Sequence, residues 1–95
     1  MKFDVGNVIV TPTASEVLKD SGLTMEKLLA RHQSGDWGDV SDQVRQINEL
    51  GLQRPLNLQS AYTTPAGQRV TFVTMADRSV TLVHLDQQVG AAAAR

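Results

Sequence analysis

The feature that most constrains this chain is a change in the spacing of its apolar residues near position 56. Before that point apolar side chains recur every three or four residues, which is the period of an amphipathic helix. After it they recur every second residue, which is the period of a β-strand. Helices followed by strands indicate an α+β domain. Ninety-five residues are enough for one such domain and too few for two.

The first half of the chain predicts three short helices. Thr13 and Glu16 have the spacing of a capping box at the start of the first helix, and Gly22 is suited to end it. Thr24 can cap the second helix and Ser41 the third, because both side chains can accept a hydrogen bond from a nearby backbone amide. The helix side chains expected to face inward are Val17, Leu18, Met25, Leu28, Leu29, His32, Val44 and Ile47.

Strands are expected at both ends of the domain. Residues 3–11 are rich in β-branched side chains and predict a short strand or an extended arm. Alternation predicts an antiparallel meander whose last two strands are apolar on both faces, so either the N-terminal arm or a second subunit can cover the second face. The expected fold is therefore two to three short helices packed on a three- to four-stranded antiparallel sheet. The meander strands are predicted at residues 56–62, 68–75 and 79–85.

The composition and charge of the chain limit which partners and which cellular compartment we expect. A net charge of −1, with basic residues spread along the chain, lacks the concentrated positive surface that binds nucleic acid, so nucleic acid is a disfavoured partner. No apolar run has the length of a signal peptide or a membrane span, and cysteine is absent. We expect a cytoplasmic protein with no membrane partner, in which residues 1–88 form the domain and residues 89–95 a flexible tail.

Few residues suggest reaction chemistry. His32 and His84 are the side chains that titrate nearest neutral pH, and neither has a catalytic spacing. A structural role is the simpler interpretation for His32, in the last turn of a helix, and for His84, in a strand near the sheet edge. The sequence contains no nucleophile elbow, no glycine-rich phosphate loop and no zinc-protease helix. We therefore predict no enzymatic activity and no cofactor.

The sequence SGDWGD at residues 34–39 predicts a turn around the chain's single tryptophan. Asp36, Asp39 and Asp42 could offer oxygens to a hard cation, but they lack the alternation and the closing glutamate of a calcium loop. Turn and capping roles are therefore favoured, and no metal is predicted. Trp37 either fills the core or stands out as an interface anchor, and burial is the commoner fate of such a ring.

The sequence ADRS at residues 76–79 joins the last two predicted strands. Asp77 suits a tight turn, and Arg78 can form a bidentate pair with a carboxylate or a phosphate. The simplest interpretation of the segment is a hairpin loop.

Several of these segments together resemble a family of small uncharacterised proteins encoded by bacterial phages, plasmids and integrated elements. Members are sometimes labelled by the restriction-modification genes beside them, and they have no established activity. This chain differs from the family pattern at Met75, where a glutamate is usual, and from Asp86 onward, where a proline and a tyrosine are usual. The resemblance covers about residues 8–86 and is carried by Val10–Pro12, Arg31–Asp39, Asp42, Asn48, Ser60–Tyr62 and Thr74–Thr81.

The resemblance implies a mobile-element accessory protein that binds a host protein, including a component of a defence system, as an inhibitor or modulator. A homodimer formed through the sheet is left open. The alternatives are a nucleic-acid-associated regulator and, third, a hydrolase that uses His32 with Asp36 or Asp39.

Two of the motifs shared with the family, SGDWGD at residues 34–39 and ADRS at residues 76–79, flank the predicted sheet. This placement suggests that they act together. We expect their polar and aromatic residues to form either one structural junction or one recognition surface. Pairing of Arg78 with Asp36 or Asp39 would explain the joint occurrence of the motifs. The candidate residues are Asp36, Trp37, Asp39, Asp77 and Arg78.

Overall fold

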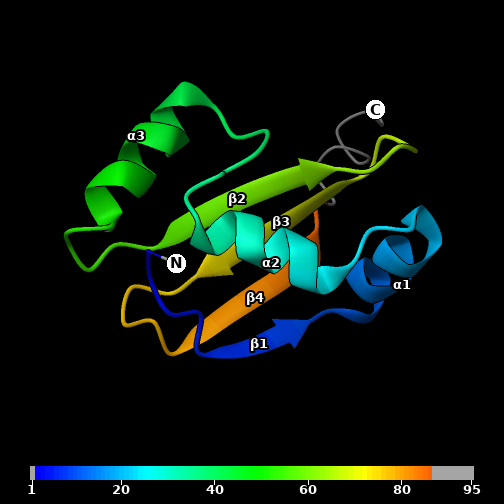
Figure 1. The fold of residues 1–95 in the computed structure, drawn as a ribbon, viewed down its shortest axis with the longest axis horizontal. Coiled ribbons are helices and arrows are strands. Elements are labelled where there is room, and N and C mark those ends of the chain that lie inside the picture. The colour runs from blue at the N-terminus through cyan, green and yellow to red at the C-terminus, as the bar shows by residue number, and fades with distance from the viewer. Residues whose placement is uncertain (1, 87–95) are drawn as a thin grey trace.

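The computed structural model describes residues 2–86, which form three helices and one four-stranded sheet (Figure 1). The predicted α+β class is confirmed, and the helices lie mostly before the strands. The predicted tail at residues 89–95 lies outside the described residues. In chain order the elements are β1 (Asn7–Val10), α1 (Pro12–Ser21), α2 (Met25–Gln33), α3 (Asp42–Gly51), β2 (Leu58–Thr63), β3 (Arg69–Thr74) and β4 (Val80–Leu85).

The strands lie in the order β1-β4-β3-β2 (Figure 1). Strands β2, β3 and β4 form the predicted antiparallel meander. β1 pairs in parallel with β4, so the N-terminal arm extends the sheet at its edge and does not cover its second face. This pairing makes β4 an interior strand over residues 80–83, and His84 lies one residue beyond the part that pairs with β1.

Gly6 explains why the first strand is shorter than residues 3–11. Its φ angle is 64°, and a Cβ atom there would collide with the backbone of Ser79. Glycine alone readily combines this left-handed conformation with so close an approach. The chain therefore bends at Gly6, and strand pairing begins at Asn7.

Local sequence signals place the helix ends with one exception. Thr24 and Ser41 cap α2 and α3 as predicted, and Gly22 ends α1 with a φ of 80°. The exception is the start of α1, where Thr11 is the cap and Pro12 is the first helical residue. Proline has a backbone angle suited to that position and no amide hydrogen to satisfy, so the cap lies at Thr11, two residues before the predicted cap at Thr13.

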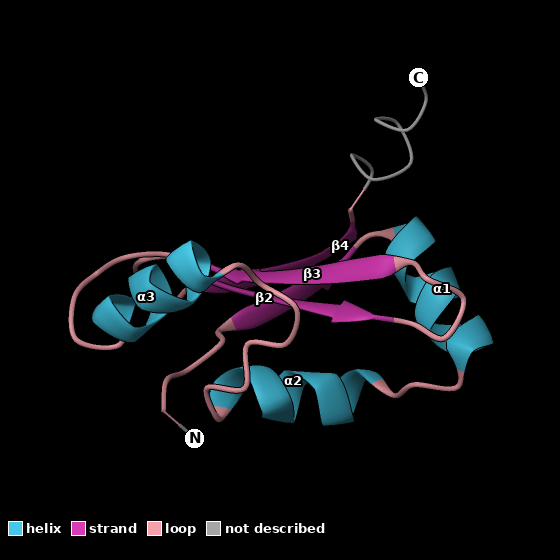
Figure 2. Ribbon diagram, turned by 90° about the horizontal axis from the view of Figure 1, so that it is seen from above, coloured by secondary structure: helices cyan, strands magenta, loops and turns pink. Residues whose placement is uncertain are grey.

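Helices α1 and α2 pack against one face of the sheet, and α3 lies beside β2 (Figure 2). Val44 on α3 packs against a second, smaller cluster that contains Trp37. Ile47 does not face inward as predicted, because α3 meets the edge of the sheet rather than its face, and 48% of Ile47 is exposed. The main core consists of Ala14, Leu18, Leu28, Tyr62, Val70, Phe72 and Val83.

Within residues 2–86 no helix covers the opposite face of the sheet (Figure 2). Ile9, Leu82 and Val73 are register partners and form an apolar row across three strands on this face. Leu82 and Val73 are half-buried, whereas 51% of Ile9 is exposed. The apolar second face that the sequence predicted is therefore present, and the N-terminal arm does not cover it.

Candidate functional site

The loop between α2 and α3 runs along the outer edge of β2. The amide of Ala61 donates to the carbonyl oxygen of Trp37 at 3.0 Å, and the amide of Asp39 donates to that of Ala61 at 2.7 Å. Between them, Gly38 has a φ of 73°, and a Cβ atom there would collide with the Ala61 carbonyl and with the ring of Tyr62. The predicted turn therefore also acts as a short parallel partner of β2.

Two side chains complete the hydrogen bonding of this edge. On α3, buried Asn48 donates to the carbonyl oxygen of Gln59 at 2.7 Å and accepts from its amide at 2.9 Å. The Asp39 carboxylate accepts from the amide of Thr63 at 3.2 Å and from its hydroxyl at 2.7 Å. Residues 59–63 of β2 are thus bonded on their outer side by groups of this chain. Asn48 entered the sequence analysis only through the family resemblance, because an asparagine within a helix carries no signal of its partner.

Trp37 is a core residue, which decides between the two interpretations of its position. Only 2% of the residue is exposed. Its ring stacks on Phe3 with centroids 6.0 Å apart, and its Nε1 donates to the Glu49 carboxylate at 2.9 Å. The tryptophan thereby fixes the loop against the N-terminal arm and α3.

Arg78 holds the turn between β3 and β4 against the end of α3. Its Nη1 donates to the carbonyl oxygen of Leu56 at 2.8 Å, and its Nη2 donates to that of Gly51 at 2.6 Å. The expected pair with Asp36 or Asp39 is therefore not formed, because these and two further backbone carbonyls take the guanidinium hydrogens. Arg78 also has a φ of 61°, a conformation uncommon outside glycine.

Phe3 brings the two sequence motifs together. One side of its ring stacks on Trp37, and the guanidinium of Arg78 lies 5.9 Å from its centroid. Asp77 takes no part in this junction, since its carboxylate accepts from the amide of Ser79 at 3.0 Å and from its hydroxyl at 2.6 Å. These hydrogen bonds lower the pKa of Asp77.

Asp36 contributes to a separate cluster with Arg31 and Tyr62. Arg31 donates to the Asp36 carboxylate from Nε at 2.7 Å and from Nη2 at 3.3 Å, which lowers the pKa of Asp36 and raises that of Arg31. The guanidinium lies 4.6 Å from the centroid of the Tyr62 ring. The Tyr62 hydroxyl donates to the Asp36 carbonyl at 2.7 Å, and burial raises the pKa of Tyr62 to about 12. Tyr62 therefore remains a neutral hydrogen-bond donor.

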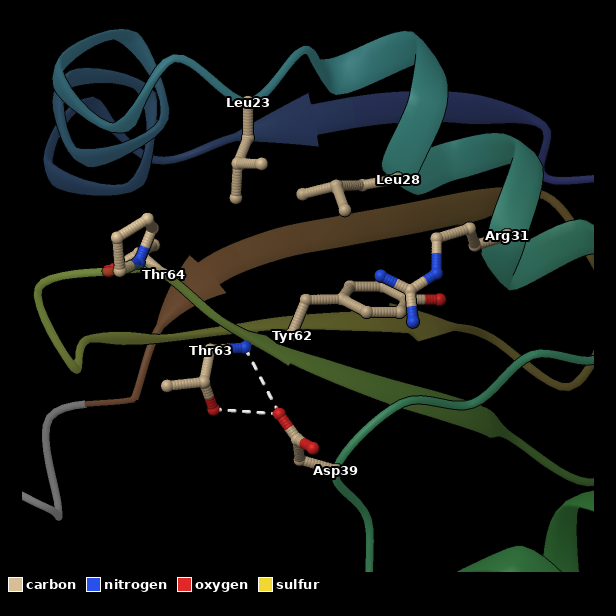
Figure 3. Close-up of a pocket in the computed structure, with 8 residues that line it drawn as sticks. Leu23, Leu28, Arg31, Asp39, Tyr62, Thr63 and Thr64 are labelled. Carbon is tan, nitrogen blue, oxygen red and sulfur yellow. Dashed lines mark hydrogen bonds between the residues drawn. The ribbon is translucent and has the colours of Figure 1, made fainter.

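A cavity of about 320 Å³ opens beside this cluster (Figure 3). Leu23 and Leu28 form its apolar wall. Arg31 and the Tyr62 ring lie across from them, and Asp39 lies at the rim on the far side of β2 (Figure 3). The cavity thus places a cation, an anion and an apolar surface around one small space.

His32 is fully buried beneath the sheet and does not meet either aspartate of the hydrolase hypothesis. Its Nδ1 is hydrogen-bonded to the hydroxyl of Ser60, and its Nε2 to that of Thr74 at 2.8 Å. Burial lowers the pKa of His32 to about 4, so the ring is neutral at pH 7. Asp36 and Asp39 are bonded to other side chains, as described above, so the structure does not assemble that catalytic group.

Asp42, the third aspartate considered for a cation, lies in the first turn of α3, and its Oδ1 is 3.9 Å from Nε of Arg45. Within residues 2–86 no three histidine, aspartate or glutamate side chains gather as they would around a metal ion. Among the same residues, no helix has both the length and the apolar character that crossing a bilayer requires. Comparisons with protein-family models, with curated proteins and with solved structures found no match to this chain.

Proposed function

We propose that this chain is an accessory protein of a mobile genetic element that binds a host protein through the outer edge of β1 and so inhibits or modulates it. The mobile-element assignment rests on the family resemblance. The mode of binding rests on one observation, that within the described part of the chain β1 has a strand partner on one side only.

The backbone of β1 has hydrogen-bonding groups to offer on its free side. The amide of Asn7 donates to Ser79 and that of Thr11 to Val83, both toward β4. Because alternate residues of a strand face opposite sides, the backbone groups of Val8 and Val10 face outward. A second strand placed there would find these groups ready to pair.

The side chains of β1 do not protect this edge. Natural edge strands are often protected by lysine, by proline or by a covering segment. The four residues of β1 are asparagine, valine, isoleucine and valine, and Val8 and Ile9 are 36% and 51% exposed. Charge does not deter an incoming apolar strand at this position.

The occupant that fits is an extended, uncharged segment of another protein, added to the sheet as a fifth strand. Main-chain hydrogen bonds supply affinity in this mode, and alternate side chains supply specificity. The row formed by Ile9, Leu82 and Val73 provides an apolar surface for such side chains. The alternative occupant is a second copy of this chain, which the experiment below distinguishes from a host protein.

The test compares variants in capture from a host lysate, with bound proteins identified by mass spectrometry. Ile9→Lys places a charge on the free edge, and Val8→Pro removes the outward amide hydrogen. We expect a captured protein to bind each variant at least about tenfold more weakly than the unaltered chain, which corresponds to about 1.4 kcal/mol. Ile47→Lys is the matched control, because this isoleucine is exposed to a similar extent on α3.

Two results would contradict the proposal. Equal capture by Ile9→Lys, Val8→Pro and Ile47→Lys would exclude β1 as the contact. A dimer of the unaltered chain in sedimentation experiments that Ile9→Lys dissociates would identify the occupant as a second copy.

A further inference from the structure

We infer that the cavity beside Tyr62 binds the amino-terminal end of a peptide whose first side chain is aliphatic. The cavity lies at the β2 side of the sheet, opposite β1, so this inference does not depend on the proposed function.

The size and the walls of the cavity suit one residue of such a peptide. Its volume of about 320 Å³ is at the small end of ligand sites and equals the liquid volume of about ten water molecules. Pro65 is one of its lining residues, and Leu23 and Leu28 form an apolar wall that can accept an aliphatic side chain (Figure 3).

The charges around the cavity favour a cation. Arg31 is neutralised by its bidentate pair with Asp36. Arg69, which donates to the backbone carbonyl of Asp39, forms its ion pair with Asp86 at 3.7 Å. The two arginines therefore balance two of the three carboxylates, and the charge of Asp39 remains. An ammonium group bound near Asp39 would neutralise it.

The position of Arg31 calls for a hydrogen-bond acceptor in the same ligand. Asp36 accepts the hydrogen of Nε and one hydrogen of Nη2, so among the described residues it leaves the hydrogens of Nη1 for another acceptor. A second carboxylate there would be repelled by Asp36, whereas a neutral peptide carbonyl would not. An ammonium group, an aliphatic side chain and a neutral carbonyl occur together at the amino terminus of a peptide, and free amino acids replace that carbonyl by a carboxylate.

The experiment is an NMR titration with three probes. Leucyl-alaninamide carries all three features, N-acetyl-leucyl-alaninamide lacks the ammonium, and leucine replaces the amide by a carboxylate. We expect saturable shifts of the Leu23, Arg31 and Thr63 amides with leucyl-alaninamide. The acetylated probe should bind at least about tenfold more weakly, since it loses a charge-assisted contact. Leucine should bind at least about fivefold more weakly because of its carboxylate.

Variants then assign the binding to this cavity. Asp39→Asn keeps an oxygen for Thr63 and removes the charge, so it should weaken leucyl-alaninamide binding about tenfold. Asp42→Asn is the matched control and should bind unchanged, since this aspartate is highly exposed. Leu23→Ala tests the apolar wall without touching the hydrogen bonds of Asp39, and it should also weaken binding. This variant keeps the inference testable if an aspartate variant is poorly folded.

Four results would overturn the inference. They are no saturable shift up to about 10 mM probe, equal binding of the acetylated probe, tighter binding of leucine, and equal loss in Asp39→Asn and Asp42→Asn. Ile9→Lys should leave this titration unchanged, so failure of the β1 contact and failure of this site are separately visible.

Discussion

On the β2 edge of the sheet, the outward backbone groups from Gln59 to the amide of Thr63 are bonded by a loop, a helix side chain and a carboxylate of the same chain. On the β1 edge, the described chain places no strand beside the outward backbone groups of Val8 and Val10. Both edges belong to one sheet, so the difference does not come from strand propensity. It comes from which distant segments return to each edge. The loop that returns to β2 also carries Trp37, whose ring packs against Phe3 and His32.

The largest expected effect comes from removing the ring that holds the loop to the β2 edge. Trp37→Ala leaves a cavity beside Phe3 and should lower the free energy of unfolding by about 3–5 kcal/mol in urea denaturation. Trp37→Phe keeps most of the packing and loses the hydrogen bond to Glu49, so about 1 kcal/mol is expected. An unchanged stability in Trp37→Ala would show that the closed edge does not depend on this ring.

Acid should lower the free energy of unfolding through protonation of His32, whose ring is hydrogen-bonded to Ser60 on β2. The pKa of His32 is about 4 in the folded protein and near 6.5 when unfolded, so the unfolded chain binds a proton first as the pH falls. Stability is therefore complete above about pH 6.5 and declines by roughly 3 kcal/mol as the pH approaches 4.

Urea midpoints measured between pH 7 and 4 test this expectation. Asp36 and Asp77, whose pKa values are lowered in the folded protein, affect stability only as the pH nears the ordinary aspartate pKa of about 3.9, at the lower end of this range. His32→Gln should be less stable at pH 7 but nearly independent of pH over the same interval. A similar decline in that variant would assign the effect to other groups.

A smaller loss of stability is expected on removing Asn48, a single side chain that completes the hydrogen bonding of the β2 edge. Asn48→Ala leaves the amide and the carbonyl of Gln59 without their partner and should cost about 1–3 kcal/mol. Hydrogen exchange should show faster exchange of the Gln59 amide in this variant. Unchanged exchange there would mean that water replaces the asparagine without loss.

The smallest effect is expected at the open edge. Ile9→Thr changes a half-exposed side chain with no helix over it and should alter the free energy of unfolding by no more than about 0.5 kcal/mol. The same urea experiment that measures Asn48→Ala measures this variant. A loss as large as that of Asn48→Ala would mean that β1 contributes as much to folding as the edge of β2 does, which would remove the contrast between the two edges.

Local signals in the sequence predicted most of the secondary structure. Thr24 and Ser41 were identified as caps because a cap and the amides it accepts from lie within one helical turn. The start of α1 was misplaced because two threonines flank Pro12 and both have capping chemistry. Ile47 was misplaced because the helical period identifies an apolar side of a helix but not whether a sheet face or a sheet edge lies against it.

The candidate site was only partly predictable from sequence. Trp37 and Arg78 do meet at one junction, but Phe3 connects them, and no sequence spacing relates residue 3 to either motif. The expected Arg78 pair with Asp36 or Asp39 assumed that opposite charges find each other, whereas backbone carbonyls surround the arginine.

The sequence by itself determined the α+β class, the order of helices and strands, and the apolar character of both sheet faces, because these depend on residue spacing and on caps within one turn of the chain. Only the tertiary structure decided that β1 joins in parallel beside β4 and that Asn48 and the Trp37 loop close β2. It also decided that, among residues 2–86, no helix covers one face of the sheet and no strand pairs with the outer edge of β1. Those outcomes depend on contacts between residues far apart in sequence. Because backbone hydrogen-bonding groups are chemically alike, only their positions in the fold decide which of them pair.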